Sequence, residues 1–274
     1  MHHVDSSFTL VAALVAVTAC ARVQPDPGMG GPPPGPTPAP ATASSAAPSP
    51  SVVATPGAEA SASPPAAASS APKGPCPPDM VDVSAACIDR YEAPNEAGAM
   101  PLVMQSAPEA EAWCKERGKR LCTEDEWLRA CQGPKGLAYP YGSKYQEHHC
   151  NQDATKYLAP NWGKLGRWPA PEAAAEVKRL NQSEPSGKRP TCVSAEGVYD
   201  LTGNIAEWVA RSRPDKDSCQ TPEEQAHRFV VKGCFWGKCF RTPHEPACEY
   251  VNCTHAAGFH SYEFGVRCCR DREP

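Results

Sequence analysis

The stretch that decides the fold is Gly118-Lys-Arg-Leu-Cys-Thr-Glu-Asp-Glu-Trp127. Its glycine is a natural helix stop, because glycine adopts the left-handed backbone conformation without strain. Thr123 and Glu126 then have the spacing of a capping box, in which both side chains satisfy backbone N–H groups at the start of a helix. Trp127 is expected in the core. The stretch predicts a tight connection between two helices, and we assign it to the scaffold rather than to catalysis.

One helix is expected on each side of this connection. The first starts after Ser106, has Glu109 at the capping-box position and ends near Gly118. The second starts after Thr123 and ends at Gly133. Both have an apolar face at a spacing of three and four residues, which predicts burial of that face: Ala110, Trp113 and Cys114 in the first helix, and Trp127, Ala130 and Cys131 in the second.

Regular periodicity fades outside these two helices, and the rest of the chain shows short elements and many turns. This mixture predicts an α+β domain, rich in loops that disulfides or ions hold in place. The expected strands are 80–83, 87–91, 229–232 and 264–268, a short helix is expected over 171–180, and turns are expected over 139–142 and 197–203.

The N-terminus has the features of an export signal. Phe8 to Thr18 is an apolar run of signal-peptide length, too short to span a bilayer. The tetrapeptide Val-Thr-Ala-Cys that ends at Cys20 resembles the bacterial lipobox, whose cysteine is lipidated. Ordinary cleavage after Ala19 or Ala21 is the alternative. Lipidation of Cys20 leaves 14 of the 15 cysteines, an even number that can all pair. We therefore expect a signal peptide over 1–20 and a lipid anchor at Cys20.

Composition divides the remainder into two parts. Residues 21–75 contain 15 of the 32 prolines and no Leu, Ile, Phe, Tyr or Trp, so we expect a disordered tether with nothing to bury. Residues 76–274 contain all six tryptophans and are expected to form one domain. The net charge of −4 argues against a nucleic-acid partner. Fifteen cysteines favour an oxidising compartment, here the bacterial cell envelope.

Six motifs in this second part occur in the order found in formylglycine-generating enzymes, also called sulfatase-modifying factors. The resemblance implies that family's compact, loop-rich α+β fold, which is related to C-type lectin folds. The matching segments are 88–95 (resembling IDxYEVTN), 118–127 (GKRLPTEAEWE), 139–142 (YPWG), 197–208 (GLYDMxGNVWEW), 232–236 (RGGSW, degenerate here) and 265–268 (GFRC).

The resemblance also implies a structural calcium ion. At the matching positions the family binds Ca²⁺ through two side chains, here Asp200 and Glu207, and two backbone carbonyls, here Gly203 and Ile205. Two carboxylates beside a glycine-containing turn suit a hard ion with oxygen ligands. The alternative is a carboxylate pair bonded to the amides of the turn. A second calcium site in the family lies near a position like Asn151, but its other ligands do not align here.

Cys234 and Cys239 reproduce the spacing of the two cysteines with which family enzymes bind Cu(I). With that copper the family oxidises a substrate cysteine to formylglycine. A second alignment, anchored on Trp236, places Cys234 on a glycine of RGGSW and Cys239 near the first active cysteine. The second active position then falls near Pro243 or His244. The further alternative is that both cysteines are disulfide partners.

Two other groups of side chains remain. Cys268 and Cys269 are adjacent in a predicted strand and point to opposite faces, so we expect them to reach different partners. The 219–253 cysteines, or an early cysteine such as Cys76 or Cys87, are the expected partners. The histidines near cysteines, at 148, 149, 255 and 260, can bind a metal or can simply line a polar surface.

Two functions remain in competition. The first is a non-catalytic binding or structural module, exported and lipid-anchored, with an unknown protein or glycan ligand. The second is a copper-dependent oxidase that converts a protein cysteine to formylglycine. The altered RGGSW motif and the number of cysteines favour the module.

Overall fold

The computed structural model describes residues 74–84, 86–154, 156, 158–215, 219–237 and 247–273, all within one compact unit, Ala66–Pro274. Every structural statement below concerns these residues. The predicted signal segment with Cys20, nearly all of the predicted tether and Cys239 lie outside them. In the described ranges, no helix combines the length and the apolar character that crossing a membrane requires.

The first sheet of the described region holds the beginning and the end of the domain together. Its strands are β1 (Met80–Asp82), β2 (Cys87–Asp89), β3 (Arg120–Leu121) and β8 (Cys268–Arg270), in the order β1-β2-β8-β3. All three pairings are antiparallel, and Ile88 lies opposite Cys269. The predicted strands at 80–83 and 87–91 are confirmed, each slightly shorter than expected.

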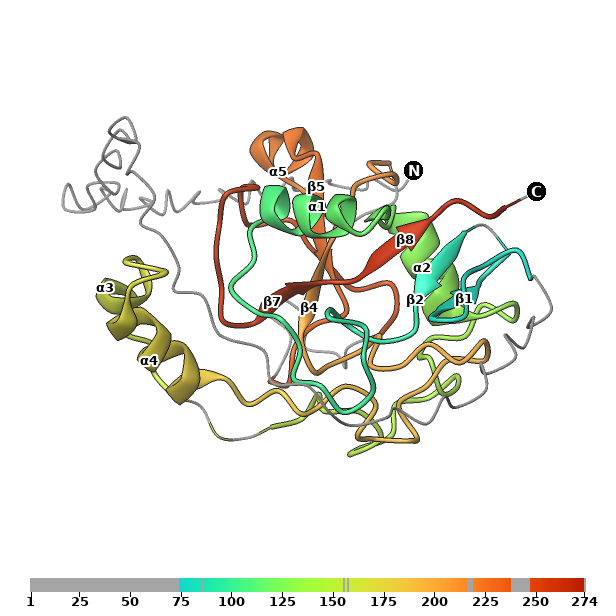
Figure 1. Ribbon diagram of the computed structural model, residues 1–274, viewed down its shortest axis with the longest axis horizontal. Coiled ribbons are helices and arrows are strands. Elements are labelled where there is room, and N and C mark those ends of the chain that lie inside the picture. The colour runs from blue at the N-terminus through green and yellow to red at the C-terminus, as the bar shows by residue number, and fades with distance from the viewer. Residues whose placement is uncertain are drawn as a thin grey trace, which may run out of the picture. The chain divides into compact units, whose positions relative to one another are not determined.

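The second sheet lies at the centre of the described region (Figure 1). Its strands are β4 (Ala206–Ala210), β5 (Phe229–Lys232), β6 (Val251–Asn252) and β7 (Phe264–Val266), in the order β6-β5-β4-β7. β4 pairs with β7 in parallel and with β5 antiparallel. The predicted strand at 229–232 is confirmed, whereas the one at 264–268 is divided into β7 and β8 at Arg267.

Both predicted capping boxes are present and start helices where the sequence placed them. α1 (Ala107–Glu116) follows Ser106, whose backbone N–H donates to Glu109 at 2.9 Å. α2 (Glu124–Gln132) follows Thr123, whose N–H donates to Glu126 at 2.8 Å. α1 packs its alanines and Cys114 against the apolar cluster around Trp208 and Val266. These two helices therefore fix the core around both sheets.

Three further helices lie in the described region. α3 (Trp162–Leu165) and α4 (Pro171–Leu180) contact each other and lie on the opposite side of β4 from α2 (Figure 1). Leu165, Val177 and Leu180 pack with Trp236 and Tyr262 in a third apolar cluster. α5 (Pro222–Ala226) follows Thr221 and precedes β5. The predicted helix over 171–180 is confirmed, while α3 and α5 were not predicted.

Disulfides connect segments that are distant in sequence. The pairs with both cysteines described are Cys76–Cys87, Cys114–Cys268, Cys122–Cys269, Cys131–Cys248, Cys150–Cys192 and Cys219–Cys253. The prediction that Cys268 and Cys269 reach different partners is confirmed. The expected partners were wrong: they are Cys114 on α1 and Cys122 beside β3, because Cys268 and Cys269 lie in two different apolar clusters, each with its partner cysteine.

Candidate functional site

A buried ion pair lies where the two sheets meet. The Arg267 guanidinium donates to the Glu207 carboxylate at 2.8–3.0 Å, to the Asp89 carbonyl oxygen at 3.0 Å and to the Tyr199 carbonyl oxygen at 2.8 Å. Trp127 Nε1 donates to Glu207 Oε2 at 2.7 Å. Both partners of the ion pair are almost fully buried. The predicted scaffold role of Trp127 is confirmed, since its indole helps to hold this pair.

Two further carboxyl groups surround this ion pair. Burial raises the pKa of Glu92 well above its ordinary range, and the nearby Asp200 carboxylate adds to the shift. Burial likewise raises the pKa of Asp200 to about 6. Glu92 accepts from Ser186 Oγ at 2.6 Å and from the Asn204 side-chain amide at 3.0 Å. Three buried carboxyl groups thus face one guanidinium, which leaves an excess of negative charge when all three ionise.

The turn that carries the predicted calcium set is tightly built. Gly203 has a φ of +81°, and a Cβ there would lie 2.3 Å from the Asn151 carbonyl oxygen, so only glycine fits. Asp200 Oδ2 accepts from the Gly187 N–H at 2.7 Å. Glu207 accepts from three N–H groups, the Trp127 indole and two of Arg267, and the Arg267 Nε–H is shared between its two oxygens. These donors, and the positive charge of Arg267, compete with a cation for Glu207.

Asn151, the doubtful second calcium residue, is engaged in the loop packing. Its side-chain amide donates to the Gln182 carbonyl oxygen at 3.1 Å and to Asn204 Oδ1 at 3.2 Å. Among the described residues, no group of three or more His, Cys, Asp or Glu side chains is placed to hold a metal ion. Both calcium assignments stay predictions.

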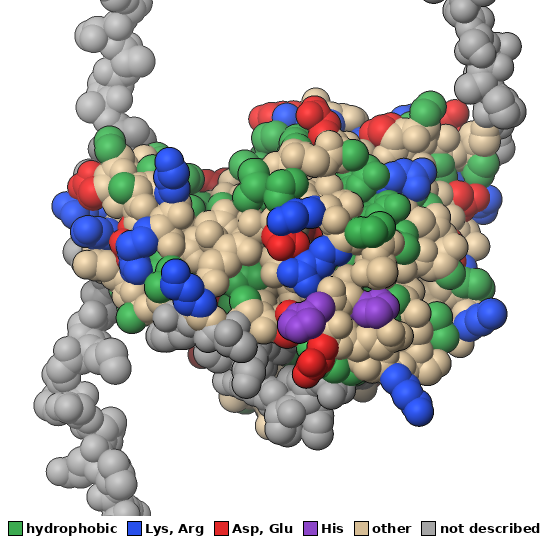
Figure 2. Space-filling view, turned by 90° about the horizontal axis from the view of Figure 1, so that it is seen from below, with side chains coloured by type: hydrophobic (Ala, Val, Ile, Leu, Met, Phe, Trp, Pro, Cys, Tyr) green, Lys and Arg blue, Asp and Glu red, His purple; other side chains and the backbone are tan. Residues whose placement is uncertain are grey.

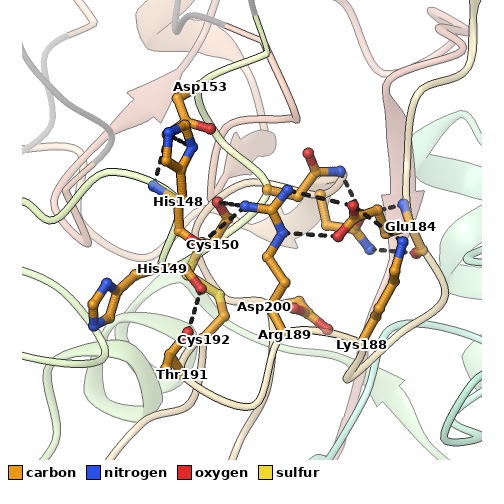
Figure 3. Close-up of polar contacts among 12 residues, drawn as sticks. His148, His149, Cys150, Asp153, Glu184, Lys188, Arg189, Thr191, Cys192 and Asp200 are labelled. Atoms are coloured by element: carbon orange, nitrogen blue, oxygen red, sulfur yellow. Dashed lines mark hydrogen bonds and ion pairs between the residues drawn. A yellow bond between two sulfur atoms is a disulfide. The ribbon is translucent and has the colours of Figure 1, made fainter.

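The histidine pair beside Asn151 belongs to a polar surface (Figure 3). His148 Nδ1 lies 2.9 Å from Asp153 Oδ2, and the His148 side chain is largely exposed. Arg189 donates to the carbonyl oxygens of His148 and Cys150 and to Glu184. Figure 2 shows one face of the molecule, on which basic, acidic and hydrophobic side chains are interspersed.

A groove of about 1160 Å³ lies in the described region. One part of its lining comes from the segment 154–162 and the end of α4, another from β6 and the loop to β7, and a third from 220–224. Phe235, Trp236 and Gly237 join these parts, and the Ala154 N–H donates to the Trp236 carbonyl oxygen at 2.9 Å. The groove therefore brings together segments that are up to 109 residues apart, from Ala154 to Glu263.

Aromatic side chains are prominent in the groove. Trp162 projects from α3 with 57% of its surface exposed. The Trp236 and Tyr262 rings lie 6.1 Å apart, and the His255 ring stacks on Phe259 with centroids 4.2 Å apart. The remaining lining residues include the amides and hydroxyls of Gln182, Gln220, Thr221, Asn252, Thr254 and Ser261.

Glu263 lies between the groove and a smaller cavity of about 30 Å³. Burial raises the pKa of its carboxyl to about 7, although a hydrogen bond with Tyr262 opposes the shift. The smaller cavity is also lined by Cys234, Asn252 and His255. It is large enough for a water molecule. Glu263 is thus a carboxyl group that exchanges a proton near neutral pH beside the groove.

Cys234 is buried beside this small cavity and is disulfide-bonded. Each of the other described cysteines pairs with another described residue, so the partner of Cys234 lies outside the described residues. A disulfide sulfur offers no thiolate, which is the form that binds copper. The Cys234/Cys239 copper pair stays a prediction that requires prior reduction of Cys234.

Comparison with known proteins agrees with the motifs. The model of the sulfatase-modifying factor enzyme 1-like (FGE-sulfatase) domain matches residues 50–272. The chain belongs to this family. The family membership that the motifs predict is therefore confirmed, and so is the loop-rich, disulfide-rich α+β class of fold.

Curated relatives of this sulfatase-modifying factor domain include proteins named as active and as inactive. The inactive C-alpha-formylglycine-generating enzyme 2 of Bos taurus is 36% identical over 115 residues, which cover 40% of this chain and 32% of the relative. The formylglycine-generating enzyme of Mus musculus is 31% identical over 114 residues, covering 40% of this chain and 27% of the relative. The chain therefore spans about a third or less of the length of these relatives.

Among solved structures, PvdO from Pseudomonas aeruginosa aligns with a TM-score of 0.41 and 19% sequence identity. The alignment covers 72% of this chain and 69% of PvdO.

The sequence motifs did not indicate the groove residues. Trp162, Glu263 and Tyr262 belong to none of the motifs and show no regular spacing with one another. The sequence signal that could have indicated them is the density of aromatic residues near the C-terminus, together with the tryptophan that precedes a glycine. Trp236 entered the sequence analysis only as the anchor of the degenerate RGGSW motif, not as part of a groove.

Proposed function

We propose that this protein is a non-catalytic binding module of the sulfatase-modifying factor family, held outside the cytoplasm by an N-terminal lipid anchor. The observation that carries the proposal is the disulfide state of Cys234. Copper chemistry of the family type needs two thiolates at this place, and an oxidised cysteine cannot supply one. The similarity to relatives named inactive supports the same conclusion.

Disulfide bonding also supports the proposed location outside the cytoplasm. Six disulfides among the described residues are consistent with an oxidising, extracytoplasmic location. The apolar run before Cys20 supports export and lipidation. The large groove supports binding, because ligand sites are commonly concave and lined by apolar and aromatic side chains with a few convergent polar groups.

Titration of free thiols tests this function directly. The purified, unreduced protein is denatured and treated with a thiol reagent, and a sample reduced beforehand serves as the positive control. We expect no reactive thiol at Cys234 and no Cu(I) bound to the unreduced protein. Two reactive thiols that bind one Cu(I) and disappear together in Cys234→Ser would reject the module and favour the enzyme.

The copper-dependent oxidase is the second candidate. The four-residue spacing between Cys234 and Cys239 favours it, and so does the similarity to proteins named formylglycine-generating enzyme. Oxidation of a cysteine-containing peptide by the reduced, copper-loaded protein would support this candidate. The same reaction with Cys234→Ser is the control.

We also propose the predicted calcium ion as a structural element, held by Asp200, Glu207 and the carbonyls of Gly203 and Ile205. The excess of buried carboxyl groups over Arg267 supports a cation in this region. The contacts of Glu207 with Arg267 oppose it, since Arg267 already supplies one positive charge there. The proposal thus depends on Asp200 more than on Glu207.

A further inference from the structure

We infer that the groove binds a neutral oligosaccharide. The inference rests on the proposed binding function and names the class of ligand. It is carried by three properties of the lining: the exposed indole of Trp162 beside partly buried aromatic rings, hydroxyl and amide groups already held in place, and little net formal charge among the described lining residues.

The helix that carries the exposed Trp162 is held in place. Trp162 is the first residue of α3, whose N-cap Asn161 accepts from the Lys164 N–H at 3.1 Å. Leu165 on the same helix is buried against Val177 and Leu180, so the helix is fixed to α4. The backbone that carries the exposed indole of Trp162 is therefore already in place when a ligand covers the ring, and only the side chain has to be ordered. Sugar rings have apolar C–H faces that lie flat on such aromatic surfaces.

The polar side chains of the lining are oriented before any ligand arrives. Gln182 Nε2 donates to the Lys156 carbonyl oxygen at 3.0 Å. Asn252 Oδ1 accepts from the backbone N–H and the hydroxyl of Thr254 at 3.0 and 2.8 Å. Amides and hydroxyls each both donate and accept hydrogen bonds. Sugar hydroxyls have the same double capacity, whereas the carbonyls of a proline-rich peptide only accept.

The charge of the lining decides between neutral and charged ligands. Among the described lining residues, the formal charges are those of Lys156, Glu224 and Glu263, beside His255. Glu224 is used to cap α5, where it accepts from the backbone N–H groups of Gln220 and Thr221. The remaining charges of Lys156 and Glu263 have opposite sign. The described part of the lining therefore carries little net formal charge, which suits a neutral chain of sugars better than a strongly acidic or basic polymer.

Binding of defined oligosaccharides to the full-length protein in detergent tests the inference. The probes are cellohexaose, maltohexaose and chitohexaose, followed by tryptophan fluorescence and isothermal titration calorimetry. Heparin and a polyproline peptide are the comparison ligands. We expect saturable binding of at least one of the three oligosaccharides and none of heparin.

Two exposed side chains provide a matched pair of variants. Trp162→Ala removes a groove ring that is 57% exposed, and Met100→Ala removes a side chain that is 51% exposed outside the groove. We expect Trp162→Ala to weaken oligosaccharide binding at least tenfold and Met100→Ala to leave it unchanged, with equal melting temperatures. The inference is overturned if none of the three oligosaccharides binds, if Trp162→Ala binds as well as wild type, or if heparin or polyproline binds instead. A negative result here leaves the thiol titration unaffected, so the failures of ligand class and of function are distinguishable.

Discussion

The neighbouring disulfides Cys114–Cys268 and Cys122–Cys269 are expected to stabilise the domain much less, one at a time, than their sequence separations indicate. The separations are 154 and 147 residues. A single bridge over such a distance contributes about 5 kcal/mol in the chain-entropy model. With one of the two in place, however, the cysteines of the other are joined by a path of only about nine residues through the first bridge. A loop of that length corresponds to about 2.5 kcal/mol.

The test replaces both cysteines of a bridge by alanine, so that no thiol is left to exchange. Urea denaturation of the otherwise oxidised protein then gives the free energy of unfolding. The matched control removes Cys76–Cys87, whose separation of 11 residues predicts about 2.7 kcal/mol by the same model. Removal of Cys114–Cys268 should cost nearly the same as this control. Removal of both long bridges should cost about 6 kcal/mol, because Cys131–Cys248 then leaves a loop of about 30 residues.

The reasoning is refuted if removal of Cys114–Cys268 alone costs about 2 kcal/mol more than removal of Cys76–Cys87. It is also refuted if the loss for both long bridges is no larger than the loss for one. Either result would show that the two bridges do not share one path through the chain.

Four other outcomes are expected. Arg267→Met should lower the free energy of unfolding, measured by urea denaturation, by about 3–5 kcal/mol, because Glu207 is left buried and uncompensated. Adding Glu207→Gln should restore part of this loss. A double variant no more stable than Arg267→Met would contradict the role of the ion pair. Glu263 has a folded pKa of about 7, above its ordinary value, so wild-type stability should fall as the pH rises from about 4.5 to 7, and Glu263→Gln should weaken this fall in melting curves. If calcium is bound, EDTA should lower the melting temperature of wild type but not of Asp200→Asn. Calcium at a hundredfold excess over its Kd stabilises the folded state by about 2.7 kcal/mol, and an unchanged wild-type melting curve rejects the ion. Mass spectrometry of the native protein should find acyl chains on Cys20, and a mature form that begins after residue 20 would reject the anchor.

The parts of the fold that local chemistry determines were predictable from sequence. Ser106 with Glu109, and Thr123 with Glu126, each satisfy the first turn of a helix within four residues, so α1 and α2 were placed correctly. β4 was not predicted, because Ala206 to Val209 are buried on both faces and therefore show no alternation of polar and apolar residues. Arg267 interrupts the last predicted strand because its side chain turns inward to Glu207, a contact across 60 residues.

The groove was beyond the reach of sequence reasoning for a related reason. Trp162 and Glu263 contribute to one cavity although 101 residues separate them. The sequence around either residue gives no sign that the two line the same groove. This arrangement depends on how α3 and the loop before β7 pack on the core. The partners of Cys268 and Cys269 were unpredictable in the same way, since pairing depends on which elements flank β8.

The position of Arg267 has a consequence for how the domain opens. Its guanidinium bonds to the Asp89 carbonyl in one sheet and to Glu207 in the other, and it does so from the residue that joins β7 to β8. If one sheet separated locally from the other, a charged side chain of this ion pair would stay buried without its partner. Partial opening would therefore cost nearly as much free energy as complete opening. The amide protons of β2 and β4 should therefore exchange with solvent at one common free energy, as a single cooperative unit, rather than in two steps.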